Sequence, residues 1–181
     1  MHNGRASEKT GRAGIGYDSH RWSSGRRLVL GGVNIPHPQG LSGHSDADAL
    51  VHAICDAVLG AVGAGDIGTH FPDTDPAFRD ISSLDLLARV GEIAAAEGYR
   101  VVNVDATVII EQPKLRPYVA GMIRNIAEAM GLAPEAVSVK AKTNEGMGFV
   151  GSGEGIAVLA VALVTPLPGN IRNKGENDTA S

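Results

Sequence analysis

Two segments of the sequence carry side chains of the kinds that bind divalent cations. Asp18 and His20 are two residues apart in a predicted strand, so both side chains should point to the same face. His52 follows in a predicted helix, one turn after Asp48. One aspartate and two histidines, with a fourth position left open, are ligands typical of a catalytic zinc ion or a similar divalent ion. The sequence therefore predicts a metal centre formed by Asp18, His20 and His52.

The charge distribution around these residues also favours cations. No lysine or arginine lies between Arg27 and Arg79, whereas this segment contains six aspartates and four histidines. A solvated acidic face would have the same composition. Among the aspartates, we expect Asp46 and Asp56 to accept hydrogen bonds from the imidazole N–H groups of the metal ligands. The whole chain has 16 basic and 20 acidic residues, a net charge of −4, which argues against nucleic acid as a partner.

Two further segments have residue types that suit a phosphate-containing ligand. Residues 140–155 predict a strand that runs into a glycine-rich turn with Thr143 and Glu145. Glycines let the backbone approach a ligand and a glutamate can hold Mg²⁺, although a purely structural turn has a similar composition. Residues 112–117 predict a proline-flanked loop with two cationic side chains. This loop could read the edge of a base while Lys114 meets a phosphate, or it could be an ordinary solvated loop.

The elements that would position these residues do not alternate regularly. We predict strands over 13–20, 28–35, 99–111, 136–142 and 156–164, and helices over 48–62, 83–97 and 117–130. This order favours an α+β fold, with a mixed β-sheet and helices packed on one face, over a doubly wound parallel sheet. A chain of 181 residues fits one domain, which we expect to span residues 14–165 between flexible terminal segments 1–13 and 166–181.

The composition excludes several other classes of protein. Apolar residues make up 43% and charged residues 20% of the chain, which excludes disordered and fibrous proteins. No segment reaches the roughly 20 apolar residues that a membrane-spanning helix needs, and the first residues lack the apolar run of a secretory signal. The single cysteine, Cys55, cannot form an internal disulfide. We therefore expect a cytoplasmic protein without a membrane partner.

Seven segments together resemble the 2-C-methyl-D-erythritol 2,4-cyclodiphosphate synthase family of the non-mevalonate pathway of isoprene biosynthesis. They are GIGYDSH (14–20), LGGVNIP (30–36), GHSDADALVHA (43–53), GDIGTHFPDTDPAF (65–78), NVDATVIIEQPKLRPY (103–118), VKAKTNEGMGF (139–149) and GSGEGIAVLAVAL (151–163). The resemblance implies a homotrimer with active sites between chains. It also implies a phosphorus-oxygen lyase that cyclises 4-diphosphocytidyl-2-C-methyl-D-erythritol 2-phosphate and releases CMP. Ser152 departs from the family, because many members have arginine there.

The resemblance also implies roles for individual residues. The three predicted metal ligands match the family's ligands of Zn²⁺ or a similar transition metal, and Glu145 matches the carboxylate that holds Mg²⁺ or Mn²⁺. His44 and Thr143 match residues credited with stabilising the transition state. Matches to methylerythritol and phosphate contacts are His44, Ser45, Asp66, Ile67, Gly68, Phe71, Pro72, Asp73, Thr74 and Asp75. Matches to cytidine contacts are Ile110, Glu111, Gln112, Pro113, Lys114, Leu115, Arg116, Ala141, Lys142 and Thr143. Further matches to substrate contacts are Asp18, Ser19, His20, Asn144, Glu145 and Phe149.

The chemistry implied by the resemblance agrees with the residues present. The substrate's own 2-phosphate attacks the β-phosphorus, so no serine, cysteine or histidine nucleophile is required. Two cations would position the phosphates and neutralise their charge, which explains how an acidic protein could handle a substrate rich in phosphate. Two alternatives remain: a hydrolase that uses the same metals to activate water, and a non-catalytic trimeric module that binds cytidine nucleotides. Product analysis and a test of turnover with both metals separate the three.

Overall fold

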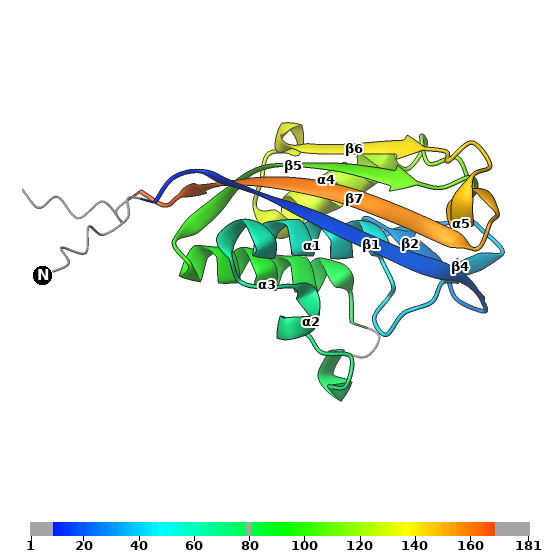
Figure 1. The fold of residues 1–181 in the computed structure, drawn as a ribbon, viewed down its shortest axis with the longest axis horizontal. Helices are drawn as coiled ribbons and strands as arrows, with labels where there is room; N and C mark the ends of the chain where they lie inside the picture. Colours follow the sequence, from blue (N-terminus) through cyan, green and yellow to red (C-terminus); the bar gives the residue numbers. More distant parts are fainter. Residues whose placement is uncertain (1–8, 79–80, 169–181) are drawn as a thin grey trace, which may run out of the picture.

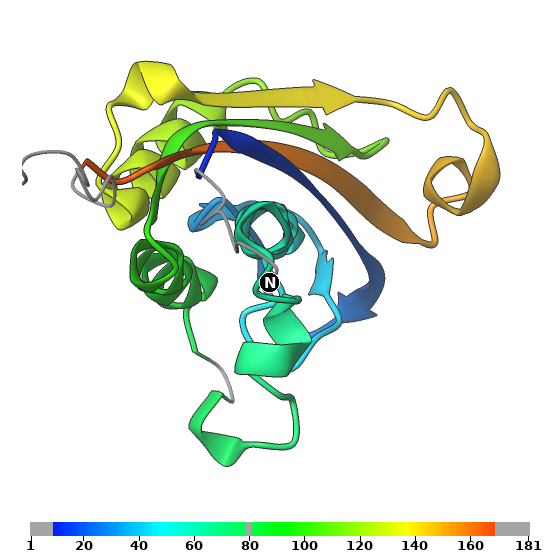
Figure 2. The same cartoon turned by 60° about the vertical axis from the view of Figure 1, so that its left-hand side comes forward.

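A computed structural model describes residues 9–78 and 81–168, which form a curved sheet with helices on its concave side (Figure 1 and Figure 2). The sheet has five strands in the order β4-β1-β7-β5-β6. Its strands are β1 (Arg12–Ser24), β4 (Gln39–Leu41), β5 (Tyr99–Ile109), β6 (Val137–Lys142) and β7 (Gly155–Pro166). Strands β5 and β6 pair in parallel, and the other neighbours in this sheet pair antiparallel. The predicted mixed sheet in a single domain is confirmed.

The three long helices, α1, α3 and α4, cover one face of this sheet, as predicted. They are α1 (Ala49–Val62), α2 (Ile67–His70), α3 (Ser83–Ala96), α4 (Val119–Met130) and α5 (Gly148–Gly151), with 3₁₀ turns at Pro76–Phe78 and Pro134–Ala136. Helix α1 packs on β1 and β7, α3 on β5, and α4 on β6. Val104, Ala106 and Val108 alternate along β5 and are buried beneath the helices. Together with the buried residues of α1, these side chains form the core. Their removal from water is the main source of stability.

Some predicted boundaries were wrong. The segment 28–35 is a hairpin of two strands, β2 (Leu28–Leu30) and β3 (Val33–Ile35), rather than one strand. Gly31 and Gly32 both have positive φ, 56° and 68°, which is the conformation of a tight two-residue hairpin turn. Strand β1 begins at Arg12 and β7 ends at Pro166, so each expected terminal segment contributes residues to the sheet. Of these two terminal segments, residues 1–8 and 169–181 lie outside the described residues.

The start of α1 is held by a carboxylate inside the protein. Asp48 accepts a hydrogen bond from the backbone N–H of Val51 at 3.1 Å and another from Gly32 at 2.7 Å. The first bond caps the helix and the second ties it to the β2–β3 turn. Asp48 is completely buried, and burial raises its pKa to about 6 although these hydrogen bonds act in the opposite direction. Asp48 therefore both caps the helix and joins it to the neighbouring hairpin.

The face of the sheet away from the helices carries an exposed apolar strip. On β1, Ile15 is 70% exposed and Tyr17 is 52% exposed. Their partners on β7 are Val161 and Leu159, and Leu163 continues the same strip. Large exposed apolar patches typically mark an interaction surface.

Among the described residues, no helix combines the length and apolarity needed to cross a bilayer.

Candidate active site

Two glycines allow α1 to lie directly on β1. A Cβ atom at Gly16 would lie only 1.9 Å from the backbone oxygen of Ala53, and Gly14 is similarly crowded by α1. A side chain at either position would push the helix away from the strand. Asp18 and His20 come next on the same face of β1. The glycines thus set the spacing between this strand and the helix that carries the third predicted ligand.

The three predicted metal ligands converge where β1 passes α1. His20 Nε2 lies 2.8 Å from Asp18 Oδ2, and His52 Nδ1 lies 3.2 Å from the same oxygen. The two imidazole nitrogens are 3.3 Å apart. In a tetrahedral zinc site with bonds of about 2.0–2.1 Å, two ligand atoms are about 3.3 Å apart. Two of the three separations are close to this value and the third is shorter, so the structure brings the three predicted side chains close enough together to share one cation.

Backbone hydrogen bonds select the atoms that face this point. His20 Nδ1 lies 2.5 Å from the carbonyl oxygen of Ser42, to which it can donate, which leaves Nε2 to act as an acceptor. Asp18 Oδ1 accepts from the backbone N–H of Ser19 at 2.8 Å, which leaves Oδ2 for the centre. Backbone groups of Ser19 and Ser42 thus orient Asp18 and His20.

The pKa values of two ligands are shifted in opposite directions. Burial alone would raise the pKa of Asp18, but hydrogen bonds and charge from His20 and His52 outweigh it and hold that pKa well below its usual range. Burial alone would lower the pKa of His20, but the hydrogen bond and charge of Asp18 outweigh it and raise that pKa. The Asp18 carboxylate is therefore an ionised ligand at neutral pH, and any proton on His20 Nε2 would have to leave before that nitrogen could bind a cation.

The second nitrogen of His52 faces two hydroxyl groups. Its Nε2 lies 2.9 Å from Ser83 Oγ and 3.1 Å from Ser45 Oγ. Ser83 in turn donates its hydroxyl hydrogen to Asp46. Asp46 was expected to accept a hydrogen bond from an imidazole directly. In the structure, the Ser83 hydroxyl lies between the Asp46 carboxylate and the His52 imidazole. The expectation for Asp56 was wrong: its carboxylate accepts from the backbone N–H of Ile67 at 2.8 Å, because it faces the α2 segment.

A cavity of about 350 Å³ lies next to the cluster. His52 forms part of its wall, together with His44 and Ser45. The other lining residues are Ile67, Gly68, Phe71, Pro72, Asp73 and Phe78, from the segment between α1 and α3, and Leu86 of α3. Among the described residues, His44 Nε2 is buried without a hydrogen-bond partner. A buried polar atom of this kind needs a partner, which a ligand in the cavity would supply.

Three of the residues matched to this subsite lie outside the cavity wall. Asp66 accepts from the backbone and side chain of Thr69 and caps α2. Asp75 accepts from the backbone N–H of Ala77, which stabilises the turn at that position. Thr74 lies between these turns and is exposed. The structure thus gives Asp66 and Asp75 local roles in shaping the cavity loop.

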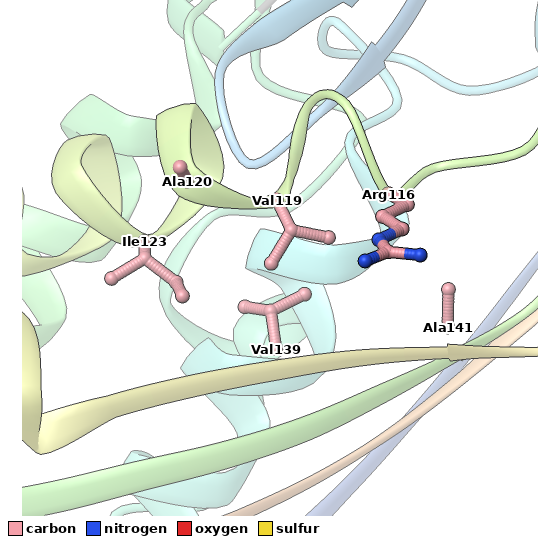
Figure 3. A pocket seen from close by; sticks show the side chains of 6 residues that line it. All are labelled: Arg116, Val119, Ala120, Ile123, Val139 and Ala141. Carbon is pink, nitrogen blue, oxygen red and sulfur yellow. The ribbon is translucent and has the colours of Figure 1, made fainter.

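A second cavity, of about 520 Å³, lies between α4 and β6. Its wall is mostly apolar, and Arg116 projects over Ala141 at one end (Figure 3). Both residues are matched to cytidine contacts. The remaining lining residues are Val119, Ala120, Ile123 and Val139. The predicted base-binding loop, residues 112–117, therefore borders an apolar cavity through Arg116.

Beside this cavity, a glutamate organises the predicted phosphate-binding turn. Glu111 accepts hydrogen bonds from the backbone N–H groups of Asn144 and Gly146, at 2.9 and 3.3 Å. Between them, Glu145 has a positive φ of 52°, and Thr143 donates to its carboxylate at 2.5 Å. Glu111 thus links the loop after β5 to the turn after β6 and holds the turn in its shape.

Within one chain, the two groups of site residues are far apart. Asp18 is on β1, whereas Glu145 and Thr143 follow β6. In the sheet, β6 lies three positions away from β1. At roughly 4.8 Å between neighbouring strands, this corresponds to about 14 Å. The described chain brings together the three-ligand cluster and its cavity, and it separately brings together the cytidine-matched loop and the glycine-rich turn.

Comparisons with known proteins identify the family of this chain. The model of the YgbB family matches residues 11–165. The chain is 58% identical over 153 residues to the 2-C-methyl-D-erythritol 2,4-cyclodiphosphate synthase of Syntrophus aciditrophicus (strain SB), a match that covers 84% of this chain and 96% of that protein. The chain therefore belongs to the YgbB family. The resemblance to 2-C-methyl-D-erythritol 2,4-cyclodiphosphate synthases, predicted from the sequence, is confirmed.

Solved structures lead to the same family. IspF of Plasmodium falciparum, in a CDP complex, superimposes with a TM-score of 0.77 and 34% identity, covering 89% of this chain and 99% of that one. The bifunctional IspDF of Campylobacter jejuni superimposes with a TM-score of 0.85 and 38% identity, covering 88% of this chain. This chain spans only 43% of that longer protein.

Proposed function

We propose that this protein converts 4-diphosphocytidyl-2-C-methyl-D-erythritol 2-phosphate to 2-C-methyl-D-erythritol 2,4-cyclodiphosphate and CMP. The observation that carries the proposal is the convergence of Asp18, His20 and His52 beside a cavity that includes His44 and Ser45. This arrangement combines a site for a cation with donors for phosphate oxygens. Membership of the YgbB family and the names of the close relatives support the same reaction.

The donor atoms indicate which cations the site would take. Asp18, His20 and His52 provide one carboxylate oxygen and two imidazole nitrogens, which suit Zn²⁺ or a similar transition metal. Glu145 provides a carboxylate, which suits Mg²⁺ or Mn²⁺. When bound, the two cations would supply Lewis-acid stabilisation of the charge that develops on the diphosphate oxygens.

In the reaction, an oxygen of the 2-phosphate forms a bond to the β-phosphorus of the substrate. The bond between this phosphorus and the oxygen that bridges to CMP breaks, and CMP leaves with the electron pair. Because the nucleophile is already ionised, no group of the protein has to remove a proton from it. The chain contributes by holding the two phosphates together and by donating hydrogen bonds to them.

The polar groups in the cavity wall suit this task. The Ser45 hydroxyl accepts from the backbone N–H of Ala47 at 3.2 Å, so its own hydrogen can turn toward a phosphate oxygen. His44 Nε2 has no partner in the described structure and can donate to the same group. Thr143 has a hydroxyl that currently donates to Glu145. We assign His44 and Thr143 to stabilisation of the transition state, and Ser45 to phosphate binding.

We further propose that the active protein is a homotrimer. Two observations support this: the exposed apolar strip with Ile15 and Tyr17 at its centre, and the separation of about 14 Å between β1 and β6. A neighbouring chain could supply the cytidine loop and Glu145 to the metal cluster of the first chain. A ring of three closes such a head-to-tail interface, because every chain then presents both surfaces.

The reaction is tested by phosphorus NMR of the substrate incubated with the protein, Zn²⁺ and Mg²⁺. The proposal expects the resonances of a cyclic diphosphate and of CMP in equal amounts. His52→Ala should abolish turnover, whereas His37→Ala, which removes a histidine outside the cluster, should retain it. Release of CMP with an acyclic product would instead indicate a hydrolase. Nucleotide binding without any turnover would indicate a binding module.

The shared site is tested by mixing two inactive variants. His52→Ala removes a metal ligand, and Lys114→Ala removes a charge of the cytidine loop. If the two halves of each site come from different chains, mixed trimers contain some sites with both halves intact. We therefore expect partial activity after subunit exchange, and each variant alone serves as the control. After exchange has been verified by mass, no recovery at any mixing ratio would show that one chain carries both halves.

A further inference from the structure

We infer that Ser83, at the first turn of α3, is a positioning residue for the metal centre, because it fixes the proton on Nε2 of His52. No ligand motif in the sequence contains this residue. The inference rests on the proposed function only in so far as the site binds a transition metal. It concerns how the third ligand is held, and it is tested on metal binding without substrate.

The direction of the hydrogen bonds follows from the groups involved. Ser83 donates its single hydroxyl hydrogen to the Asp46 carboxylate, whose oxygens accept hydrogen bonds. Ser83 Oγ is then left with lone pairs, and its contact with His52 Nε2 at 2.9 Å requires the imidazole to be the donor. Nε2 therefore carries the proton that remains when Nδ1, which lies 3.2 Å from Asp18 Oδ2, gives its lone pair to a cation.

Burial gives this contact its importance. The Ser83 residue is 0% exposed, and the His52 side chain is 14% exposed. Water therefore cannot readily replace the hydroxyl, and an imidazole without this acceptor would leave a polar N–H group poorly satisfied. Ser45 Oγ, at 3.1 Å, is a second acceptor for the same N–H group, but it also lines the substrate cavity. Ser83 supports the ligand without facing the substrate.

The Asp46 carboxylate holds Ser83 in place through two hydrogen bonds. Its Oδ2 accepts from the Ser83 backbone N–H at 3.0 Å, and its Oδ1 accepts from the Ser83 hydroxyl. The negative charge at the first turn of α3 also interacts favourably with the helix dipole. Because Asp46 precedes α1 and Ser83 begins α3, this pair ties the two helices together at the metal site. The orientation of His52 is thus set by α3, although the ligand itself is on α1.

The experiment compares metal binding by the full-length wild-type protein with that by Ser83→Ala, Ser83→Thr and Asp46→Asn, with no substrate present. Affinity for Zn²⁺ and Co²⁺ is measured by competition with a chelator. Loss of a group that supports a metal ligand typically lowers affinity by about 10- to 100-fold. We expect a fall in this range for Ser83→Ala and a smaller fall for Asp46→Asn. Ser83→Thr keeps the hydroxyl and should restore most of the affinity that alanine loses.

A spectroscopic readout separates positioning from a general loss of structure. In protein labelled with ¹⁵N-histidine and loaded with Zn²⁺, we expect His52 Nε2 to carry a proton that exchanges slowly with water. In Ser83→Ala this proton should exchange too rapidly to be seen, while the backbone spectrum of α3 is retained. Ser82→Ala is the matched control, because the Ser82 side chain makes no capping hydrogen bond and should affect neither readout.

Three outcomes would overturn the inference. One is a Ser83→Ala protein with wild-type affinity for both cations. Another is a His52 Nε2 proton that stays protected in that variant. A third is a Ser83→Ala protein that loses metal because it is unfolded, while a folded Asp46→Asn protein binds metal as the wild type does. If the wild-type protein itself bound neither cation, the proposed metal centre would fail together with this inference.

Discussion

Replacing Gly16 with alanine should damage both the stability and the metal centre, because α1 would have to move away from β1. The new Cβ would lie 1.9 Å from the backbone oxygen of Ala53, whereas ordinary contact begins at 3.4 Å. The helix would therefore have to withdraw by roughly 1.5 Å. If this movement reached the centre, the distance of 3.2 Å between His52 Nδ1 and Asp18 Oδ2 would become about 4.7 Å. Two ligands of one tetrahedral cation cannot be that far apart.

The magnitude of the effect on stability follows from the same contact. Overpacking typically costs about 1–3 kcal/mol, and the upper end is expected because the opposing atom belongs to a helix backbone that cannot rotate away. Gly91→Ala is the matched control. A Cβ at Gly91, inside α3, meets nothing within 4 Å. Alanine there should raise the free energy of unfolding by about 0.5–1 kcal/mol, because glycine disfavours helices.

Urea unfolding and Zn²⁺ titration of the two variants test this reasoning. We expect Gly16→Ala to lower the free energy of unfolding and to weaken Zn²⁺ binding by at least about 10-fold, the lower limit for a disturbed ligand shell. Gly91→Ala should leave Zn²⁺ binding unchanged. A Gly16→Ala protein with wild-type stability and wild-type affinity would refute the view that the glycines set the position of α1.

Three further predictions concern single side chains. Because the pKa of Asp48 is raised from 3.8 to about 6, the native state holds this proton more tightly than the unfolded chain, and the free energy of unfolding should fall as pH rises from about 4 to 6. Asp48→Asn should remove that part of the slope in urea unfolding, and an unchanged slope would contradict the assignment. Glu145→Gln should raise the Mg²⁺ concentration needed for half-maximal turnover while Zn²⁺ affinity stays the same; identical Mg²⁺ titration curves would exclude Glu145 from that site. Tyr17→Asp places a charge in the exposed apolar strip and should convert the proposed trimer to monomers in sedimentation experiments, with loss of activity; a trimer that stays intact would place the interface elsewhere.

Much of the fold was predictable because local signals agreed with tertiary packing. Helix α1 follows its predicted boundaries because Asp48 caps it and Gly63 ends it in a left-handed conformation. The hairpin at 28–35 was missed because its two strands are only three residues each, too short for an alternation pattern to be seen. The adjacent glycines at 31 and 32 were the available signal for a turn.

The candidate site was predictable where strand and helix periodicity decide the geometry. The spacing of Asp18 and His20 puts both on one face of β1, and the capped helix brings His52 to the same point. The supporting groups could not be found in this way. Ser83 is 37 residues from Asp46 in sequence, and only the packing of α3 beside α1 brings the two together. Asp56 was misassigned because periodicity gives the direction of a side chain but not its partner.

The alternation of faces along β1 limits how this part of the chain can vary. Gly14, Gly16, Asp18 and His20 face the helix, while Ile15 and Tyr17 face outward between them. The insertion or deletion of one residue before Asp18 would exchange the two sets, because the side-chain period of a strand is two. The ligands would then point away from α1, and apolar side chains would meet the space reserved for a helix backbone. We therefore expect β1 to tolerate insertions or deletions only in multiples of two residues. The outward-facing residues should tolerate substitution more readily than those that face the helix.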